Sequence, residues 1–297
     1  MIISDKRSII LAYNTVERLL KGDFFHFSKI EEITQEIANF DKEWPVIGLG
    51  TTNWYKRNGE AIVEGFAESP EFLWADPESI PPGKLINLNH DHPDHKENLK
   101  SPVIGPEDAL PQFPFMAIAL CDPKELREYT LSAGENVHEW IENKFPSENL
   151  GLAAIHIGGK LDEVKSTAAC HIPIGGLDLN EGYSLKDNFK FIEYKTGSWS
   201  MQGLYGINPT IQQVLSVPGH PLHLHGYEIN EKRGGHISTR QFPHPQPGLR
   251  STRSKTSISA SKIWIKPLYP SNPCNNKTCT RNSGNFQANI PVPLYLS

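Results

Sequence analysis

Three closely spaced histidines, His223, His225 and His236, are the residues of this chain best suited to chemistry. In a β-strand alternate side chains share a face, so His223 and His225 would point the same way. A turn centred on Asn230 and Glu231 would return the chain as a second strand and place His236 opposite His225, where cross-strand Cβ atoms lie about 5 Å apart. The spacing therefore predicts a β-hairpin on which three imidazoles bind one divalent cation.

The chemistry expected of such a site is metal-ion chemistry. Three protein nitrogens with one open position are typical of catalytic zinc sites, and imidazole also suits manganese, iron, nickel and copper. The alternative is that ordinary histidines coincide on a hairpin, because the chain contains 12 histidines in all. We favour the metal site, and the spacing alone leaves the metal open.

A second histidine cluster, His90-Asp91-His92-Pro93-Asp94-His95, fits the HxHxDH pattern of the metallo-β-lactamase superfamily, whose members use it to bind zinc for hydrolysis. That pattern normally follows an apolar strand and precedes glycines, whereas here Lys96-Glu97-Asn98 follows it within a polar stretch. We therefore favour a coincidence in a polar loop. A hydrolase acting through His90, His92 and His95 is the less favoured alternative.

The elements that would position these residues alternate between strands and a few helices. Apolar residues at helical spacing predict helices over residues 8–20, 28–40 and 124–145. Apolar runs predict strands over residues 45–52, 60–65, 113–120, 151–157, 164–172 and 189–194, before the hairpin at 221–240. The order predicts an α+β fold of mixed and antiparallel β-sheets with a few flanking helices, rather than a doubly wound parallel sheet.

The expected catalytic region covers residues 1–242. Within it, Asn58-Gly59 predicts a hairpin turn that brings Glu60 to the head of a returning strand. Residues 68–112 are rich in Pro, Asn, Asp and His and lack periodicity, which predicts a loop insertion. Residues 243–297 are rich in Pro, Ser, Asn and basic residues and are expected to form a tail of unknown role.

Composition favours a soluble globular protein, with 38% hydrophobic and 21% charged residues. No apolar run approaches the roughly 20 residues that cross a bilayer, and the N-terminal apolar run is too short for a secretory signal, so we expect a cytoplasmic protein without membrane contact. The 4 cysteines are expected to be reduced thiols. The stretch from Lys232 to the end holds basic residues and no acidic ones, but these charges are dispersed, so we expect no nucleic-acid partner.

Several motifs occur in the order typical of the α-acetolactate decarboxylase family, which the chain resembles from about residue 23 to residue 238. The segments that carry the resemblance are Val46-Ile47-Gly48-Leu49-Gly50-Thr51, Asn58-Gly59-Glu60-Ala61-Ile62-Val63, Phe113-Pro114-Phe115-Met116-Ala117, Leu152-Ala153-Ala154-Ile155-His156-Ile157-Gly158-Gly159, Val217-Pro218-Gly219 and Gly234-Gly235-His236. The family's HxH-x10-H spacing is matched residue for residue by the three histidines.

The resemblance implies a two-part α+β fold, often dimeric, so a homodimer is an expectation. It implies that His223, His225 and His236 bind Zn²⁺ and that Glu60 serves the site. It also implies a carbon-carbon lyase that converts 2-acetolactate, a small 2-hydroxy-3-keto acid, into acetoin and carbon dioxide. The residue types suit that reaction, because a zinc Lewis acid stabilises the charge left by decarboxylation and a nearby carboxylic acid returns a proton. The alternative for Glu60 is an ordinary exposed hairpin glutamate.

Two departures from the family pattern bear on the substrate. Thr167 falls where the family has an arginine that suits a substrate carboxylate, and Lys165, two residues away on the same strand face, is the candidate replacement. The family also uses an acidic residue near its C-terminus, and this chain has no acid after Glu231. The alternatives are therefore a lyase or isomerase acting on another hydroxy-keto acid, or a metal-binding pseudoenzyme.

Overall fold

The computed structural model describes residues 9–21, 26–54, 57–89, 110–132, 135–148, 150–161, 164–168, 191–194, 196–217, 219–238 and 258–270. These residues form a 15-stranded sheet whose main path runs β1-β7-β3-β4-β5-β6-β14-β13-β12-β9-β15-β8. Every strand pairing in the described ranges is antiparallel. The predicted α+β class is confirmed, and among the described residues no helix is long and apolar enough to span a membrane.

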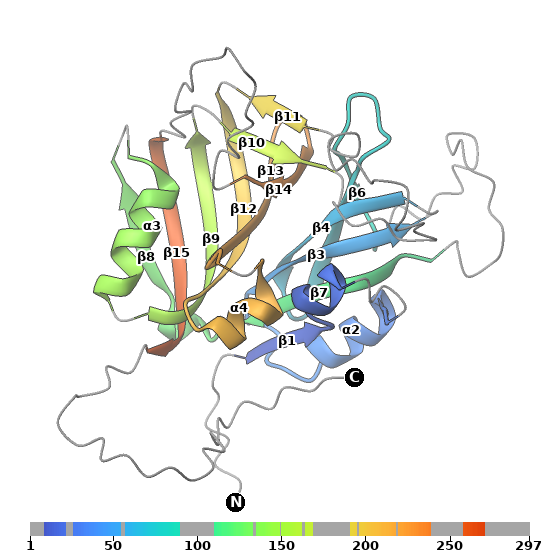
Figure 1. The fold of residues 1–297 in the computed structure, drawn as a ribbon, viewed down its shortest axis with the longest axis horizontal. Coiled ribbons are helices and arrows are strands. Elements are labelled where there is room, and N and C mark those ends of the chain that lie inside the picture. Colours follow the sequence, from blue (N-terminus) through green and yellow to red (C-terminus); the bar gives the residue numbers. More distant parts are fainter. Residues whose placement is uncertain are drawn as a thin grey trace, which may run out of the picture.

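The first half of the sheet is built from the N-terminal elements, coloured blue to green in Figure 1. Its strands are β1 (Ile9–Tyr13), β2 (Ser28–Lys29), β3 (Val46–Trp54), β4 (Arg57–Phe66), β5 (Ser69–Asp76), β6 (Lys84–Asn87) and β7 (Gln112–Leu120). Its helices are α1 (Val16–Leu20) and α2 (Ile30–Ile37). Helix α2 buries Ile33 and Ile37 against this sheet, as the helical spacing predicts.

The second half contains the remaining strands, of which β8, β15 and β9 stand nearest to α3 in Figure 1. They are β8 (Arg127–Leu131), β9 (Leu150–Leu161), β10 (Val164–Thr167), β11 (Phe191–Tyr194), β12 (Gly197–Gly206), β13 (Leu222–Glu228), β14 (Arg233–Ile237) and β15 (Ile258–Pro270). A 3₁₀ turn (Pro123–Glu125) precedes β8, and the helices are α3 (Val137–Ser147) and α4 (Pro209–Leu215).

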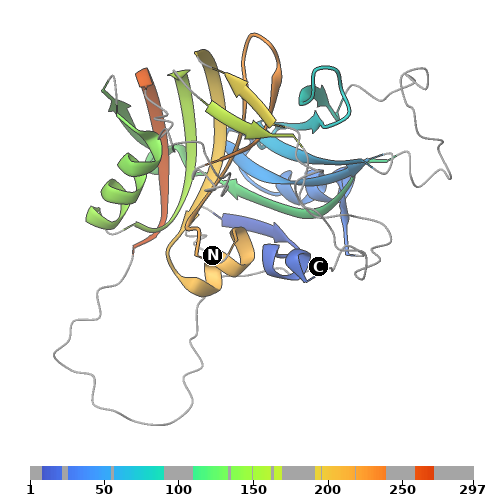
Figure 2. The ribbon, with the colours of Figure 1, turned by 45° about the horizontal axis from the view of Figure 1, so that its top comes forward.

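The two halves face each other, and the strands of one lie across those of the other in both views (Figure 2). They are joined where β6 meets β14, through hydrogen bonds from Leu85 N to Lys232 O (2.8 Å) and from Gly234 N to Gly83 O (2.9 Å). Part of the space between them is an apolar cluster that includes Leu49, Phe115 and Leu204. Burial of this cluster stabilises the facing arrangement through the hydrophobic effect.

Two helix predictions were wrong in part. The stretch predicted as one helix over 8–20 begins as β1, which pairs with β7, and only Val16–Leu20 is helical. Asn14, at φ +62°, separates the two elements, and Thr15 caps the helix by accepting a hydrogen bond from Arg18 N. The predicted helix over 124–145 likewise contains β8 before α3 begins. Pairing with a neighbouring strand overrides local helical periodicity in both places.

Three further predictions differ from the structure. Asn58-Gly59 lies within β4 rather than at the turn, because Asn58 pairs with Asn53 and Gly59 with Thr52. The stretch predicted as a loop over 68–112 contains β5 and β6, while residues 90–109 lie outside the described ones. The predicted tail 243–297 contains β15, which pairs with β8 and β9.

Candidate metal centre

The hairpin predicted from the histidine spacing is present. Strands β13 and β14 pair with His225 directly opposite His236, as predicted. Glu228 holds the turn between them, because its Oε1 accepts from Asn230 Nδ2 at 2.9 Å and its Oε2 from Glu231 N at 2.6 Å. The register of the hairpin, and with it the meeting of the two histidines, is therefore fixed by turn contacts as well as by strand pairing.

The glycines before His236 allow β14 to approach two neighbouring strands closely. A side chain at Gly234 would collide with the backbone of Tyr227, and one at Gly235 would collide with the carbonyl of Thr167. Gly235 also has a φ of +151°, which residues with side chains rarely adopt. The Gly-Gly pair therefore lets β14 lie between β13 and β10 with His236 beside Thr167.

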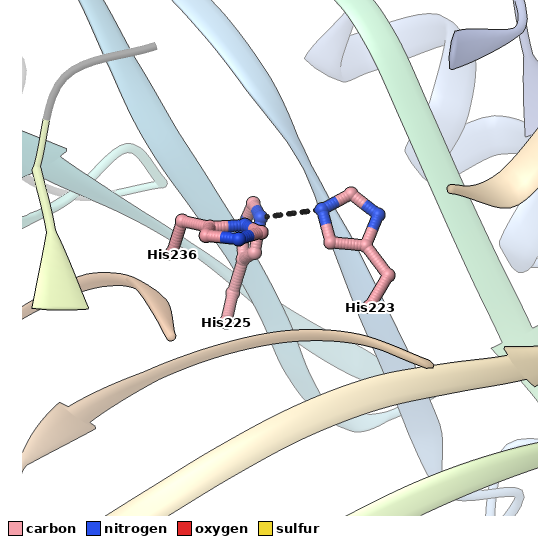
Figure 3. A group of neighbouring side chains, drawn as sticks. All are labelled: His223, His225 and His236. Atoms are coloured by element: carbon pink, nitrogen blue, oxygen red, sulfur yellow. Dashed lines mark hydrogen bonds between the residues drawn. The ribbon is translucent and has the colours of Figure 1, made fainter. Parts of the chain in front are cut away.

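The three imidazoles converge on one point between the strands (Figure 3). Each offers one nitrogen, and the three nitrogens lie within 4.8 Å of one another. The ring centroids are 4.9 Å apart for His223 and His225, 5.1 Å for His223 and His236, and 5.3 Å for His225 and His236. This group can hold a metal ion.

Hydrogen bonds to backbone carbonyls fix which nitrogen of two rings faces the centre. His223 Nδ1 lies 2.7 Å from Leu215 O at the end of α4, and His225 Nδ1 lies 2.8 Å from Ala61 O on β4. A carbonyl only accepts, so both Nδ1 atoms carry the proton and both Nε2 atoms present lone pairs.

The two Nε2 atoms nevertheless lie 3.1 Å apart, the contact dashed in Figure 3. Two neutral rings in these tautomers cannot hydrogen-bond to each other through Nε2, and their lone pairs repel. The separation is close to the edge of a zinc tetrahedron, about 3.3 Å for Zn–N bonds of roughly 2.0–2.1 Å. The donor set therefore fits a shared cation better than it fits a bare pair of rings.

Burial keeps these rings neutral. It lowers the pKa of His223 to about 4 although the Leu215 carbonyl opposes the shift. The pKa of His225 is lowered too, first by burial and then by the neighbouring His223, against the Ala61 carbonyl. Neutral imidazole is the form that binds a metal, so the site is prepared for a cation at neutral pH.

Glu60 is the acidic residue beside the histidines. Its Oε2 lies 3.6 Å from His225 Nε2, its side chain is 6% exposed, and its backbone N–H donates to Ala168 O at 3.2 Å. Burial raises the pKa of the Glu60 carboxyl. Burial thus disfavours the charged form of both Glu60 and His225, and the alternative of an exposed hairpin glutamate is excluded.

Apolar and hydroxyl side chains surround the centre. The ring of Phe115 on β7 stacks on His223, with centroids 6.2 Å apart and planes 6° apart. Thr51 on β3 pairs with Glu60, and Thr167 on β10 pairs with His236; both threonines are buried. Since side chains of paired residues share a sheet face, these residues border the site.

Lys165 lies less close to the histidines. Lys165 precedes Thr167 by two residues on β10, so its side chain lies on the same face of the strand. Its backbone carbonyl accepts a hydrogen bond from Ser238 N at 3.0 Å, just past the paired residues Ser166 and Ile237. The side chain is half-buried. The competing motif His90-Asp91-His92-Pro93-Asp94-His95 lies outside the described residues.

Sequence reasoning missed the backbone partners of the histidines. The carbonyls of Ala61 and Leu215 carry no sequence signal, because any residue has one. It also missed Gln202, the strand neighbour that pairs with His225, and Glu64 on β4, whose carboxylate bonds Gln202. An acidic residue on the buried face of a strand is a signal that could have pointed to Glu64.

Comparison with known proteins identifies the fold. No family model and no curated protein matches the sequence. Among solved structures, acetolactate decarboxylase from Bacillus subtilis subspecies spizizenii matches with a TM-score of 0.52 at 16% identity, over 86% of this chain and 85% of that chain. The chain has the acetolactate decarboxylase fold.

Two more structures share the acetolactate decarboxylase fold with this chain. The enzyme from Bacillus subtilis strain 168 has a TM-score of 0.52 and 16% identity over 86% of this chain and 84% of that chain. A protein of unknown function from Staphylococcus aureus, described as similar to α-acetolactate decarboxylase, has a TM-score of 0.52 and 14% identity over the same shares. At such low identity the structural likeness establishes the fold alone, and the function of the site must be argued from its own residues.

Proposed function

We propose that this protein is a metal-dependent carboxy-lyase that decarboxylates a 2-hydroxy-3-keto acid such as 2-acetolactate to acetoin and carbon dioxide. The observation that carries the proposal is the buried Glu60 carboxyl, whose Oε2 lies 3.6 Å from Nε2 of His225 within the three-histidine centre. A protonated acid beside a cation site can serve a reaction that builds negative charge on oxygen and then needs a proton on carbon. The fold shared with acetolactate decarboxylase supports the same reaction class.

Zinc is the metal we propose, held by Nε2 of His223, Nε2 of His225 and one ring nitrogen of His236. Bound there, a zinc ion would supply a Lewis acid for the hydroxyl and keto oxygens of the substrate. The carbonyls of Leu215 and Ala61 keep two of the rings in the metal-binding tautomer.

Glu60 supplies the proton that the reaction consumes. The bond between C2 and the carboxylate carbon breaks, carbon dioxide leaves, and the electron pair is delocalised into the neighbouring keto group. Glu60 then transfers its proton to C2, which restores the keto group, and water reprotonates the Glu60 carboxylate. Delivery from one fixed side chain places the proton on one face of C2, so the acetoin formed is predominantly one enantiomer.

Lys165 is the residue we propose to attract the substrate carboxylate. It shares the face of Thr167, which pairs with the ligand His236. A lysine ammonium is a point charge on a flexible stem, so it attracts a carboxylate without imposing the two-pronged geometry of an arginine. We expect looser substrate selection than an arginine would give.

The test is release of carbon dioxide and formation of acetoin from racemic 2-acetolactate by the zinc-loaded protein, with the metal-depleted protein as control. Zinc-dependent formation of acetoin supports the proposal. Zinc-loaded protein that releases no carbon dioxide contradicts it and favours a lyase or isomerase for another hydroxy-keto acid, or a metal-binding protein without catalysis. A panel of 2-hydroxy-3-keto acids with larger side chains separates those two outcomes.

A further inference from the structure

A second polar cluster lies between the two halves of the sheet, beside the metal centre. Glu64 on β4 accepts three hydrogen bonds from the opposite half: from Tyr227 Oη to Oε1 at 2.6 Å, and from Gln202 Nε2 and Ser200 Oγ to Oε2 at 3.0 Å and 3.4 Å. His156 Nε2 lies 3.3 Å from Ser200 Oγ. We call these five residues the Glu64 cluster. The proposed reaction uses none of them.

Glu64 and the residues that hydrogen-bond to it lie on the strands that carry Glu60 and His225 or on a strand paired with them. On β4, Glu64 follows Glu60 by four residues and therefore shares its face. Tyr227 follows His225 by two residues on β13, and Gln202 on β12 pairs directly with His225. The facing surfaces of β4 and of β12 and β13 thus carry Glu60 opposite the histidines, and Glu64 and its hydrogen-bond donors lie next to them along the same strands.

The two shorter contacts of Glu64, with Tyr227 and Gln202, are shielded from water. Gln202 is 3% exposed and Tyr227 is 8% exposed, so water competes weakly for their hydrogen bonds. Burial, and then the nearby Glu64, raises the pKa of the Tyr227 phenol, which therefore remains a donor.

Between Glu60 and Glu64, strand β4 touches the opposite half at two further points. The Ala61 carbonyl accepts from His225 Nδ1 at 2.8 Å, and the buried Ile62 packs in one cluster with Tyr227. The placement of Glu60 against the histidines thus depends on how β4 is held on β12 and β13. The Glu64 side chain makes this attachment through three hydrogen bonds to β12 and β13.

We propose that Glu64 is a positioning residue that holds β4 on β12 and β13, and thereby places Glu60 and the Ala61 carbonyl against His225. Its effect on turnover rests on the proposed function, whereas its effect on His225 does not. The hydrogen bonds of Glu64 go to Ser200, Gln202 and Tyr227 and not to the three histidines, so we infer that it acts through the strand that carries Glu60. Loss of its carboxylate should loosen the Ala61–His225 hydrogen bond.

The test is proton exchange at histidine Nδ1–H groups, followed by NMR in the zinc-loaded, full-length protein with ¹⁵N-labelled histidine. In Glu64→Gln and Glu64→Ala, the Nδ1–H of His225 should exchange at least tenfold faster than in the wild type. The Nδ1–H of His223 should be unchanged, because its acceptor, Leu215 O, lies at the end of α4 rather than on β4. Glu71→Gln is the matched control, since exposed Glu71 lies opposite Glu64 on the neighbouring strand β5.

Faster exchange at His225 alone supports the positioning role. Unchanged exchange at His225, or an equal increase at both histidines that marks general loss of stability, overturns it. In the decarboxylation assay the same variants should lose roughly 10- to 100-fold in kcat with little change in KM, because a misplaced acid impairs the chemical step. If the wild type does not decarboxylate acetolactate, the proposed function fails while the exchange measurement still decides the role of Glu64.

Discussion

Glu60 and His225 meet across the two halves of the sheet, with Oε2 of the acid 3.6 Å from Nε2 of the imidazole. Both side chains are nearly inaccessible, at 6% and 1% exposure. Burial acts on them in opposite senses, raising the pKa of the Glu60 carboxyl and lowering that of the His225 imidazole. In the proposed function this pair is a proton donor beside a metal ligand, and the predictions below follow from that proposal.

Removal of one ligand should abolish stoichiometric metal binding. We expect His225→Ala and His236→Ala each to lose the bound zinc ion, because two remaining imidazoles cannot complete a tight tetrahedral site. Metal content of the purified variants, measured by atomic emission, checks this. His92→Ala is the control and should keep its zinc; if it loses zinc while His225→Ala keeps it, the metal lies at the HxHxDH motif instead.

Zinc affinity should fall less between pH 8 and pH 6 than it would at a site of exposed histidines. Protons compete with a metal only near the pKa of its ligands, and burial holds the pKa of His223 at about 4 and lowers that of His225. Exposed histidines, with a pKa of about 6.5, would lose affinity over this range. Competition titrations with a chelator at several pH values measure the effect, and a steep fall in affinity below pH 7 would show that the rings titrate as exposed groups.

The metal-depleted protein should lose stability as the pH falls from about 6.5 toward 4. The folded pKa of His223, about 4, lies below its unfolded value, so the unfolded chain binds more protons in this window. The stabilising contribution of the neutral ring is present above pH 6.5 and is lost as the pH falls. Denaturant unfolding at each pH measures the slope, which should be shallower in His223→Gln. An equal slope in that variant would assign the pH dependence to other groups.

Replacing the acid should impair chemistry while leaving metal binding intact. In Glu60→Gln we expect kcat to fall by about 10²- to 10⁴-fold, the usual contribution of a general acid, and the enantiomeric excess of acetoin to fall as water protonates either face. Steady-state kinetics and chiral chromatography of the product check this. Activity near the wild-type level with retained stereochemistry would remove Glu60 from the reaction.

Loss of the ammonium of Lys165 should weaken substrate binding more than turnover. We expect Lys165→Met to raise KM for acetolactate by roughly tenfold with kcat within a few-fold of the wild type, because an electrostatic attraction of this kind acts on the ground state and the transition state alike. Lys160→Met, a surface change on β9, is the control. An unchanged KM in Lys165→Met would show that a group other than Lys165 binds the substrate carboxylate.

Gly235 should tolerate no side chain, because its φ is +151° and a Cβ would collide with the carbonyl of Thr167. We expect Gly235→Ala to lower the free energy of unfolding by about 1–3 kcal/mol and to weaken zinc binding, since the adjacent His236 must shift. Gly219→Ala is the matched control, with a φ of +83° but no atom within 4 Å of the added Cβ. Equal zinc affinity in the two variants would show that Gly235 is not needed to position His236 for zinc binding.

Local patterns were enough to predict which three histidines converge and the strands that carry them. The two-residue spacing of His223 and His225 and the turn at Asn230 and Glu231 predict the hairpin register, because strand periodicity and turn position are local properties. The same patterns failed where a distant strand decided the outcome. Ile9–Tyr13 carries helical spacing, yet it extends to pair with β7.

The sequence by itself thus determined which three imidazoles converge and that Glu60 stands on a strand. Only the tertiary structure decided what surrounds them. Facing the two halves of the sheet brings Ala61 to His225 and Glu64 to Tyr227, over separations of 164 and 163 residues in the chain. Helix α4 packs so that its last residue, Leu215, meets His223. These contacts set tautomer, burial and pKa, and such quantities depend on neighbours that no local pattern of residues specifies.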